Sequence, residues 1–185
     1  ERRRANDGVD LGCGAVGVGG QCQVGEDVVA GLLAAVADVV VALRDGLYFA
    51  DRQGVLGSTI AGAPYDPAHH RFNDGRCDPR GRFFVGAMNE RRDADSAGLW
   101  RLDPDLSLHP VLDGVMISNG LAWSPDGRTM YHADTPKHVV RAYDYDVATG
   151  TPSRPRTFAR WDGETDRPDG GAVDAEGCYW TAFYR

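Results

Sequence analysis

Three polar residues, Asn73, Asn119 and Asp169, each open a copy of one short phrase that the chain contains three times. The copies begin 46 and 50 residues apart, and a glycine stands eight residues after each opening residue. Amide and carboxylate oxygens are hard donors, which suit Ca²⁺, Mg²⁺ or Mn²⁺ better than soft metals. A divalent cation held by two amides and one carboxylate keeps residual positive charge, so it can polarise a carbonyl and lower the pKa of bound water. The three residues are therefore candidates for a metal site.

The same residue types also suit turns, and a repeated unit repeats its turns. The second halves of the three copies, 78–81, 124–127 and 174–177, are predicted to be turns because they combine Asp or Pro with glycine. The opening residue of each copy precedes a strand instead of joining two strands, which favours a site at that position. Turn chemistry and a metal site both remain open for the three opening residues.

The spacing of the copies indicates stacked supersecondary units, since about 40–50 residues is the size of a four-stranded propeller blade. The innermost strand of each blade lines a central channel, so equivalent residues of successive blades converge on the axis although they are distant in sequence. The chain is therefore predicted to be all-β, an incomplete propeller of about three to four blades that ends within the third copy.

Short apolar runs separated by turn residues predict the individual strands. Asp45-Gly46 between two apolar runs predicts a hairpin with strands at 39–43 and 47–50, although an alanine-rich helix remains open for 32–43. The stretch 57–70, which is rich in Gly, Pro and His, is predicted to be a loop. Further strands are predicted at 82–88, 98–102, 106–112, 121–123, 129–133, 139–145, 171–173 and 179–183.

Composition excludes several classes of protein. The 24 glycines and 10 prolines suit short strands and turns, and a net charge of −7 gives no support for nucleic-acid binding. Four scattered cysteines without a CxxC pair favour a reducing, cytoplasmic setting. The most apolar run, 28–43, is too short to span a bilayer, so no membrane partner is expected.

Two regions are predicted on this basis. Residues 1–27 show no clear period and are predicted to form an irregular N-terminal segment, whereas 28–185 are predicted to form the partial propeller. The chain has no initiating Met and stops in the middle of a blade, so it is expected to be a fragment.

His69 and His70 are adjacent and could suggest a metal pair. Neighbouring residues on a strand point to opposite faces, so the two rings cannot easily share one ion. They are predicted to be solvent-exposed or substrate-adjacent loop residues.

The segment 71–82, Arg-Phe-Asn-Asp-Gly-Arg-Cys-Asp-Pro-Arg-Gly-Arg, closely resembles the regucalcin (senescence marker protein)/gluconolactonase family, as does Gly-Ala-Met at 86–88. The segments 118–127 and 168–177, with Trp180 after them, match the same family in the same order. The resemblance covers about residues 30–185. It implies a six-bladed β-propeller that hydrolyses sugar lactones and similar esters at one divalent metal ion in the channel, Ca²⁺, Zn²⁺, Mn²⁺ or Mg²⁺.

The resemblance also implies roles for individual residues. Asn119 and Asp169 resemble metal ligands of the family, and Asp169 is in addition the implied general base. Asn73 resembles the channel asparagine close to substrate, and Arg71 resembles the arginine that hydrogen-bonds the substrate.

Two further functional positions of the family cannot be assigned to one residue of this chain. The family's metal-binding Glu lies in a Glu-x-Pro-x-Trp segment, and nothing here matches it; Glu26 lacks the Pro and the Trp. An acidic substrate contact is expected between residues 88 and 99, where Glu90, Asp93 and Asp95 are the candidates.

The function implied is a metal-dependent hydrolase of a sugar lactone, in which water attacks the metal-polarised carbonyl. Two alternatives remain open: a calcium-binding regulatory propeller without turnover, and an inactive truncated propeller. A lactone-hydrolysis assay with added Ca²⁺, Mn²⁺ or Zn²⁺ separates the first two hypotheses. The sequence predicts a small-molecule partner and does not predict an oligomeric state.

Overall fold

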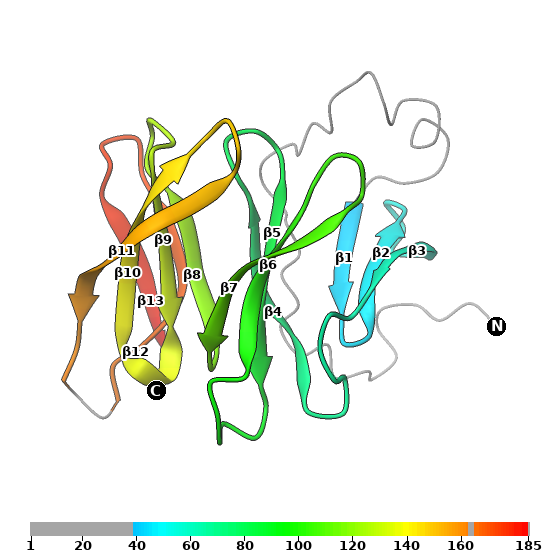
Figure 1. The fold of residues 1–185 in the computed structure, drawn as a ribbon, viewed down its shortest axis with the longest axis horizontal. Helices are drawn as coiled ribbons and strands as arrows, with labels where there is room; N and C mark the ends of the chain where they lie inside the picture. Colours follow the sequence, from blue (N-terminus) through cyan, green and yellow to red (C-terminus); the bar gives the residue numbers. More distant parts are fainter. Residues whose placement is uncertain (1–38, 163–164, 185) are drawn as a thin grey trace.

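A computed structural model of the protein describes residues 39–162 and 165–184 (Figure 1). Within these residues the chain is built from β-strands, short turns and one 3₁₀ turn, η1 (Thr135–Lys137). No helix in this part of the chain has the length and apolar character needed to cross a membrane. The predictions for residues 1–27 and 32–36 lie outside the described residues.

The strands form four antiparallel sheets, in which each strand pairs with the next along the chain. The first two sheets comprise β1 (Val39–Leu43), β2 (Gly46–Ala50) and β3 (Leu56–Gly62), then β4 (His70–Cys77), β5 (Phe83–Asn89), β6 (Ala97–Leu102) and β7 (Leu108–Val115). The last two comprise β8 (Ser118–Trp123), β9 (Thr129–Asp134), β10 (Val139–Asp146) and β11 (Thr151–Arg160), then β12 (Arg167–Val173) and β13 (Tyr179–Tyr184).

This arrangement confirms the predicted all-β, incomplete propeller. Two complete four-stranded blades stand between a three-stranded sheet and a two-stranded sheet, and the first strands β4, β8 and β12 lie next to one another (Figure 1). The hairpin at Asp45-Gly46 is also confirmed, with Leu43 opposite Gly46 and Val39 opposite Ala50. The helical alternative for 39–43 is wrong.

Three strands differ from the prediction. The loop predicted at 57–70 was wrong for its first part, because β3 pairs with β2 there and carries the β-branched Thr59 and Ile60. The strands β4 and β11 were not predicted, since both are rich in polar residues. Pro152 and Pro155 are tolerated in β11 because it is an edge strand of its sheet.

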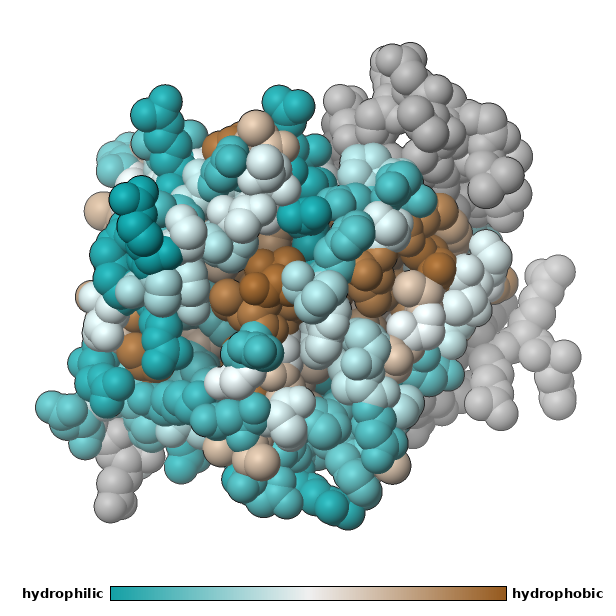
Figure 2. All heavy atoms as spheres, in the orientation of Figure 1, coloured by the Kyte–Doolittle hydropathy of each residue, from teal (hydrophilic) through white to brown (hydrophobic). Residues whose placement is uncertain are grey.

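The hydrophobic core lies between neighbouring sheets. Strand β5 is buried on both faces, because successive side chains of a strand point in opposite directions. Phe83 and Val85 pack with Leu47 toward the first sheet, whereas Phe84 packs with Trp123 toward the third sheet. Figure 2 shows hydrophilic residues over most of one face, with hydrophobic residues gathered in separate groups among them.

The turn at 78–81 carries a buried ion pair that joins two blades. The Arg82 guanidinium lies 2.6 Å from the Asp78 carboxylate and donates to the Val147 carbonyl of the next blade at 2.7 Å. The hydroxyl of Tyr145 donates to the same carboxylate, and burial raises the pKa of this phenol. The Asp78 side chain is 0% exposed, so its charge depends on these partners.

All three predicted turns at the ends of the phrases are present. Gly81, Gly127 and Gly177 have φ angles of 80°, 70° and 88°, a conformation that residues with a Cβ atom rarely adopt. The second half of the phrase is therefore turn chemistry, as predicted.

Replacing Arg82 by Ala should destabilise the protein strongly, because it leaves the buried Asp78 carboxylate unpaired. Breaking a buried ion pair in this way costs about 3–5 kcal/mol of unfolding free energy. Urea denaturation followed by tryptophan fluorescence would measure it. Arg128 occupies the equivalent position of the next copy but is exposed, so Arg128→Ala is the matched control and should change stability by less than about 0.5 kcal/mol. Equal losses in the two variants would contradict a structural role for the pair.

Candidate functional site

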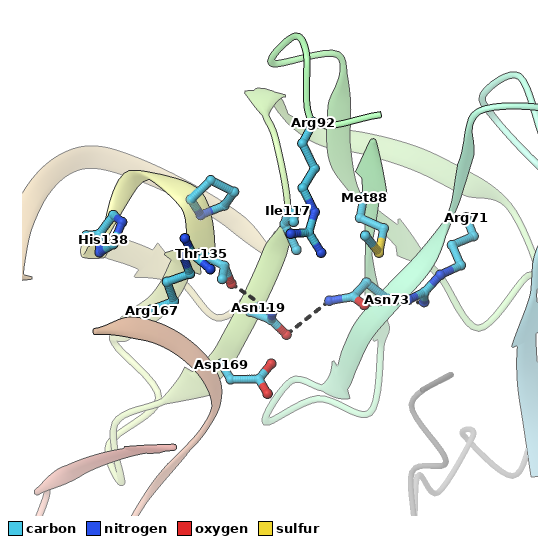
Figure 3. Close-up of a pocket in the computed structure, with 11 residues that line it drawn as sticks. Arg71, Asn73, Met88, Arg92, Ile117, Asn119, Thr135, His138, Arg167 and Asp169 are labelled. Carbon is cyan, nitrogen blue, oxygen red and sulfur yellow. Dashed lines mark hydrogen bonds between the residues drawn. The ribbon is translucent and has the colours of Figure 1, made fainter. Parts of the chain in front are cut away.

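A cavity of about 400 Å³ lies where the first strands β4, β8 and β12 meet (Figure 3). All four residues predicted from the sequence, Arg71, Asn73, Asn119 and Asp169, line it. The propeller arrangement thus brings together residues that are up to 98 positions apart in the chain. The structure places the predicted site residues as one group.

Each first strand contains a β-bulge at the start of the phrase. Phe72 and Gly75 stand opposite Ala87 and Val85, so β4 has one residue more than its partner in this interval. Bulges of this kind re-aim side chains and occur beside functional sites. The same irregularity falls between Asn119 and Ala122 in β8 and between Pro168 and Gly171 in β12.

The opening half of the phrase is therefore a bulge within a strand and not a turn between strands. Glycine is required in it because the backbone approaches other groups closely. A Cβ atom on Gly75 would lie 2.9 Å from the Phe84 carbonyl oxygen, and Gly120 has a φ angle of 58°.

A chain of hydrogen bonds fixes the orientation of the Asn119 amide. The Pro168 carbonyl can only accept, so the Thr135 hydroxyl donates its hydrogen there, at 2.6 Å. The hydroxyl oxygen must then accept from Asn119 Nδ2, at 2.8 Å. Asn119 Oδ1 is left facing the cavity, where Asn73 Nδ2 donates to it at 3.1 Å (Figure 3). Asn73 Nδ2 also donates to the Ser118 carbonyl at 2.9 Å.

Asp169, Asn73 and Asn119 form the polar floor of the cavity. The Asp169 side chain is half-buried and makes no hydrogen bond or ion pair with any of the described residues. Figure 3 shows the carboxylate beside Asn119. The oxygens of Asn119 and Asp169 are hard donors from neighbouring blades, so this pair fits a divalent cation. Asn73 turns its amide nitrogen toward Asn119, which makes it a positioning partner of that residue.

A second carboxylate, Asp74, follows Asn73 in β4 without lining the cavity, and it was not predicted. Its Oδ2 accepts from the Leu121 amide of β8 at 3.1 Å. Burial raises the pKa of Asp74, and the negative charge of Asp169 raises it further, while the amides of Leu121 and Gly75 oppose the shift. A signal exists in the sequence, because the equivalent position of the other two copies is glycine.

Arg71 is held at the rim of the cavity. Its Nη1 donates to the Phe72 carbonyl at 3.0 Å, and its Nε lies 3.4 Å from the Glu90 carboxylate. Glu90 is itself held by Arg44 at 2.6 Å, and the hydrogen bond from Arg44 is the main reason that the pKa of Glu90 is lowered.

None of the three candidates for the acidic substrate contact lines the cavity. Glu90 pairs with the two arginines, Asp93 accepts from Asn89 at 2.8 Å, and Asp95 pairs with Lys137 at 2.8 Å. The same loop instead presents Arg92 to the cavity, and this residue was not predicted. Thr135, His138 and Arg167 are further lining residues that sequence reasoning missed.

His69 and His70 do not line the cavity, and both are half-buried. The prediction of solvent-exposed or substrate-adjacent loop histidines was therefore wrong for His70, which lies in a strand, and neither residue is fully exposed. His70 opens β4, where its Nε2 lies 2.9 Å from Ser96 Oγ.

Comparison with known families decides the family of this protein. The SMP-30/gluconolactonase/LRE-like region family matches residues 4–185. The chain belongs to this family. The resemblance seen in the sequence is thereby confirmed.

Individual members of the family are similar over most of the chain. A 6-deoxy-6-sulfogluconolactonase of Pseudomonas putida is 47% identical over 78% of this chain and 50% of its own length. Regucalcin of Gallus gallus is 40% identical over 70% of this chain and 45% of its own length. The structure of a calcium-binding protein, regucalcin, from Agrobacterium tumefaciens superposes with a TM-score of 0.72 at 29% identity, over 80% of this chain and 51% of that one. The chain thus spans about half the length of these SMP-30/gluconolactonase proteins.

The raised pKa of Asp74 predicts a pH dependence of stability. The folded protein holds this proton to a higher pH than the unfolded chain, whose carboxyl has the ordinary value of 3.8. The contribution of Asp74 to the unfolding free energy is therefore present below pH 3.8 and is lost as the pH rises through the raised pKa. Asp74→Asn should remove this pH-dependent contribution to the unfolding free energy. Denaturation of both proteins across acidic pH would measure the difference.

Asp126→Asn provides a control of opposite sign. The Ser124 hydroxyl lowers the pKa of Asp126, so its contribution is lost as the pH falls through the lowered pKa. A difference between the parent and Asp74→Asn that did not change with pH would contradict the assignment.

Proposed function

We propose that this chain carries catalytic and metal-binding residues of a hydrolase that opens sugar lactones. The observation that carries the proposal is the fixed Asn119 oxygen beside the unpaired Asp169 carboxylate in one cavity. Membership of the gluconolactonase family supports it, as does the name of the Pseudomonas putida relative, a sulfogluconolactonase. The substrate we propose is a small sugar lactone such as gluconolactone.

We propose Asn119 and Asp169 as ligands of one divalent metal ion, Ca²⁺, Zn²⁺, Mn²⁺ or Mg²⁺. When bound, such an ion would polarise the lactone carbonyl and lower the pKa of water. The order of hydrogen bonds from Thr135 to Asn119 supports this role, because it keeps an amide oxygen and not an amide nitrogen toward the site.

The residues of the chain have separate roles in the proposed reaction. Asp169 accepts a proton from water as the water oxygen attacks the carbonyl carbon. The ring carbon–oxygen bond then breaks, and the departing alkoxide takes the proton back from Asp169 to give the open-chain acid. Arg71 donates hydrogen bonds to the oxygens of the sugar, and Asn73 holds both the substrate and the amide of Asn119.

We also propose that the protein works in the cytoplasm, without a nucleic-acid or membrane partner. The four scattered cysteines, which include no CxxC pair, support a reducing setting.

A second candidate function is calcium binding without turnover. It is favoured by the same hard oxygen donors and by the Agrobacterium tumefaciens relative that is described as a calcium-binding protein. Saturable Ca²⁺ binding together with no hydrolysis of any lactone would favour it.

Asp169→Asn should abolish metal-dependent lactone hydrolysis, because it removes both a ligand charge and the proton acceptor. Loss of a general base alone lowers rates about 10²–10⁴-fold. Acid release from glucono-1,5-lactone would be followed on the intact protein, first stripped of metal and then supplied with each ion. Asp162→Asn, at an exposed site on the approach to β12, is the matched control and should keep full activity. Full activity of Asp169→Asn would eliminate the proposed role.

A further inference from the structure

The charges that line the cavity are unusual for this protein. The chain as a whole carries a net charge of −7, but the cavity is lined by three arginines and a single carboxylate, Asp169. Arg71 is compensated by Glu90 at 3.4 Å, outside the cavity. Arg92 and Arg167 make no side-chain hydrogen bond or ion pair with any residue in 39–162 or 165–184. Two guanidinium charges thus face the cavity without a partner among these residues.

The two arginines lie on the same side of Asn119 in Figure 3, with Arg92 beside Ile117 and Arg167 beside Thr135. Asp169 lies on the other side of Asn119 in this view. A ligand that reacts near Asp169 would therefore extend its far end toward Arg92 and Arg167. The cavity of about 400 Å³ has the size of a site for a sugar-sized molecule.

The loop that presents Arg92 is held in one shape. Arg92 has a φ angle of 56°, which a non-glycine residue adopts only where the surroundings impose it. The buried Asn89 imposes it, since its Nδ2 donates to Asp93 at 2.8 Å, to the Ala94 carbonyl at 3.0 Å and to Ser96 at 3.1 Å. The backbone from which the Arg92 side chain extends is thus fixed before a ligand arrives.

Arg167 is placed by the strand that also carries Asp169. It opens β12 opposite Tyr184, and the preceding residue is fixed because its carbonyl lies 3.0 Å from Nδ1 of His138. His138 lines the cavity as well. A single strand therefore delivers one cationic group and the reactive carboxylate to the same site.

We propose that Arg92 and Arg167 bind a sulfonate or phosphate group at the far end of the substrate, so that the protein selects acidic sugar lactones over neutral ones. Guanidinium groups form paired, charge-assisted hydrogen bonds with tetrahedral oxyanions. The substrate class rests on the proposed lactonase function, whereas the anion site itself can be tested by binding alone.

The test measures the affinity of the intact protein for three open-chain acids by calorimetry: gluconate, 6-phosphogluconate and 6-deoxy-6-sulfogluconate. The two acids with a second anionic group should bind about tenfold or more tightly than gluconate, and the larger preference identifies phosphate or sulfonate as the group selected. Arg92→Gln and Arg167→Gln should each reduce that preference roughly tenfold and leave gluconate binding within about twofold. Arg91→Gln is the matched control, because this neighbour of Arg92 is exposed and does not line the cavity.

Equal affinity for the three acids would overturn the anion site. An equal loss for all three acids in Arg92→Gln and Arg167→Gln would overturn it too, because the arginines would then support the fold or pair with other acidic residues. Lactone hydrolysis is measured separately on the same proteins. Selective binding without hydrolysis of any lactone would contradict the proposed function and support the anion site. Hydrolysis without selective binding would support the proposed function and contradict the anion site.

Discussion

One extra residue in each of the strands β4, β8 and β12 is the constraint on which the site depends. A bulge interrupts the ladder of backbone hydrogen bonds, and buried backbone groups need other partners. The neighbouring blades supply them: Asn73 donates to the Ser118 carbonyl, Asp74 accepts from the Leu121 amide, and the Tyr179 hydroxyl donates to the Gly120 carbonyl at 2.7 Å. The bulges are therefore stabilised by contacts between blades.

This arrangement gives the same few residues a structural and a chemical role. Asn73 holds the Ser118 backbone and the Asn119 amide with one nitrogen, so the joint between two blades and the floor of the cavity are a single unit. Charged groups of both signs surround this unit. Asp169 and the arginines Arg92 and Arg167 line the cavity, whereas Asp74 is adjacent to Asn73 and does not line it.

The sequence predicted what depends on repetition and missed what depends on tertiary contacts. The phrase gave the period, the turns at its ends and the residues that meet in the cavity. The sequence could not show whether the opening half of the phrase is a turn or a β-bulge, because glycine is common in both. Strands β3, β4 and β11 were missed because polar or glycine-rich strands lack an apolar pattern. Arg92 was missed because its place beside the cavity depends on the shape of a loop that the hydrogen bonds of Asn89 hold.

The ion pair of Asp78 and Arg82 joins the second blade to the third. The next copy of the phrase has no equivalent buried ion pair, since Arg128 is exposed. The joints between blades therefore differ in chemistry. The joint between the second and third sheets contains a buried charge, whereas the joint to the fourth sheet includes hydrogen bonds between neutral groups, from Thr135 to the Pro168 carbonyl and from Tyr179 to the Gly120 carbonyl. The proton acceptor of the proposed reaction thus lies beside a joint bridged by neutral groups, whereas the strand that carries Arg71 belongs to a sheet whose joint contains the buried ion pair.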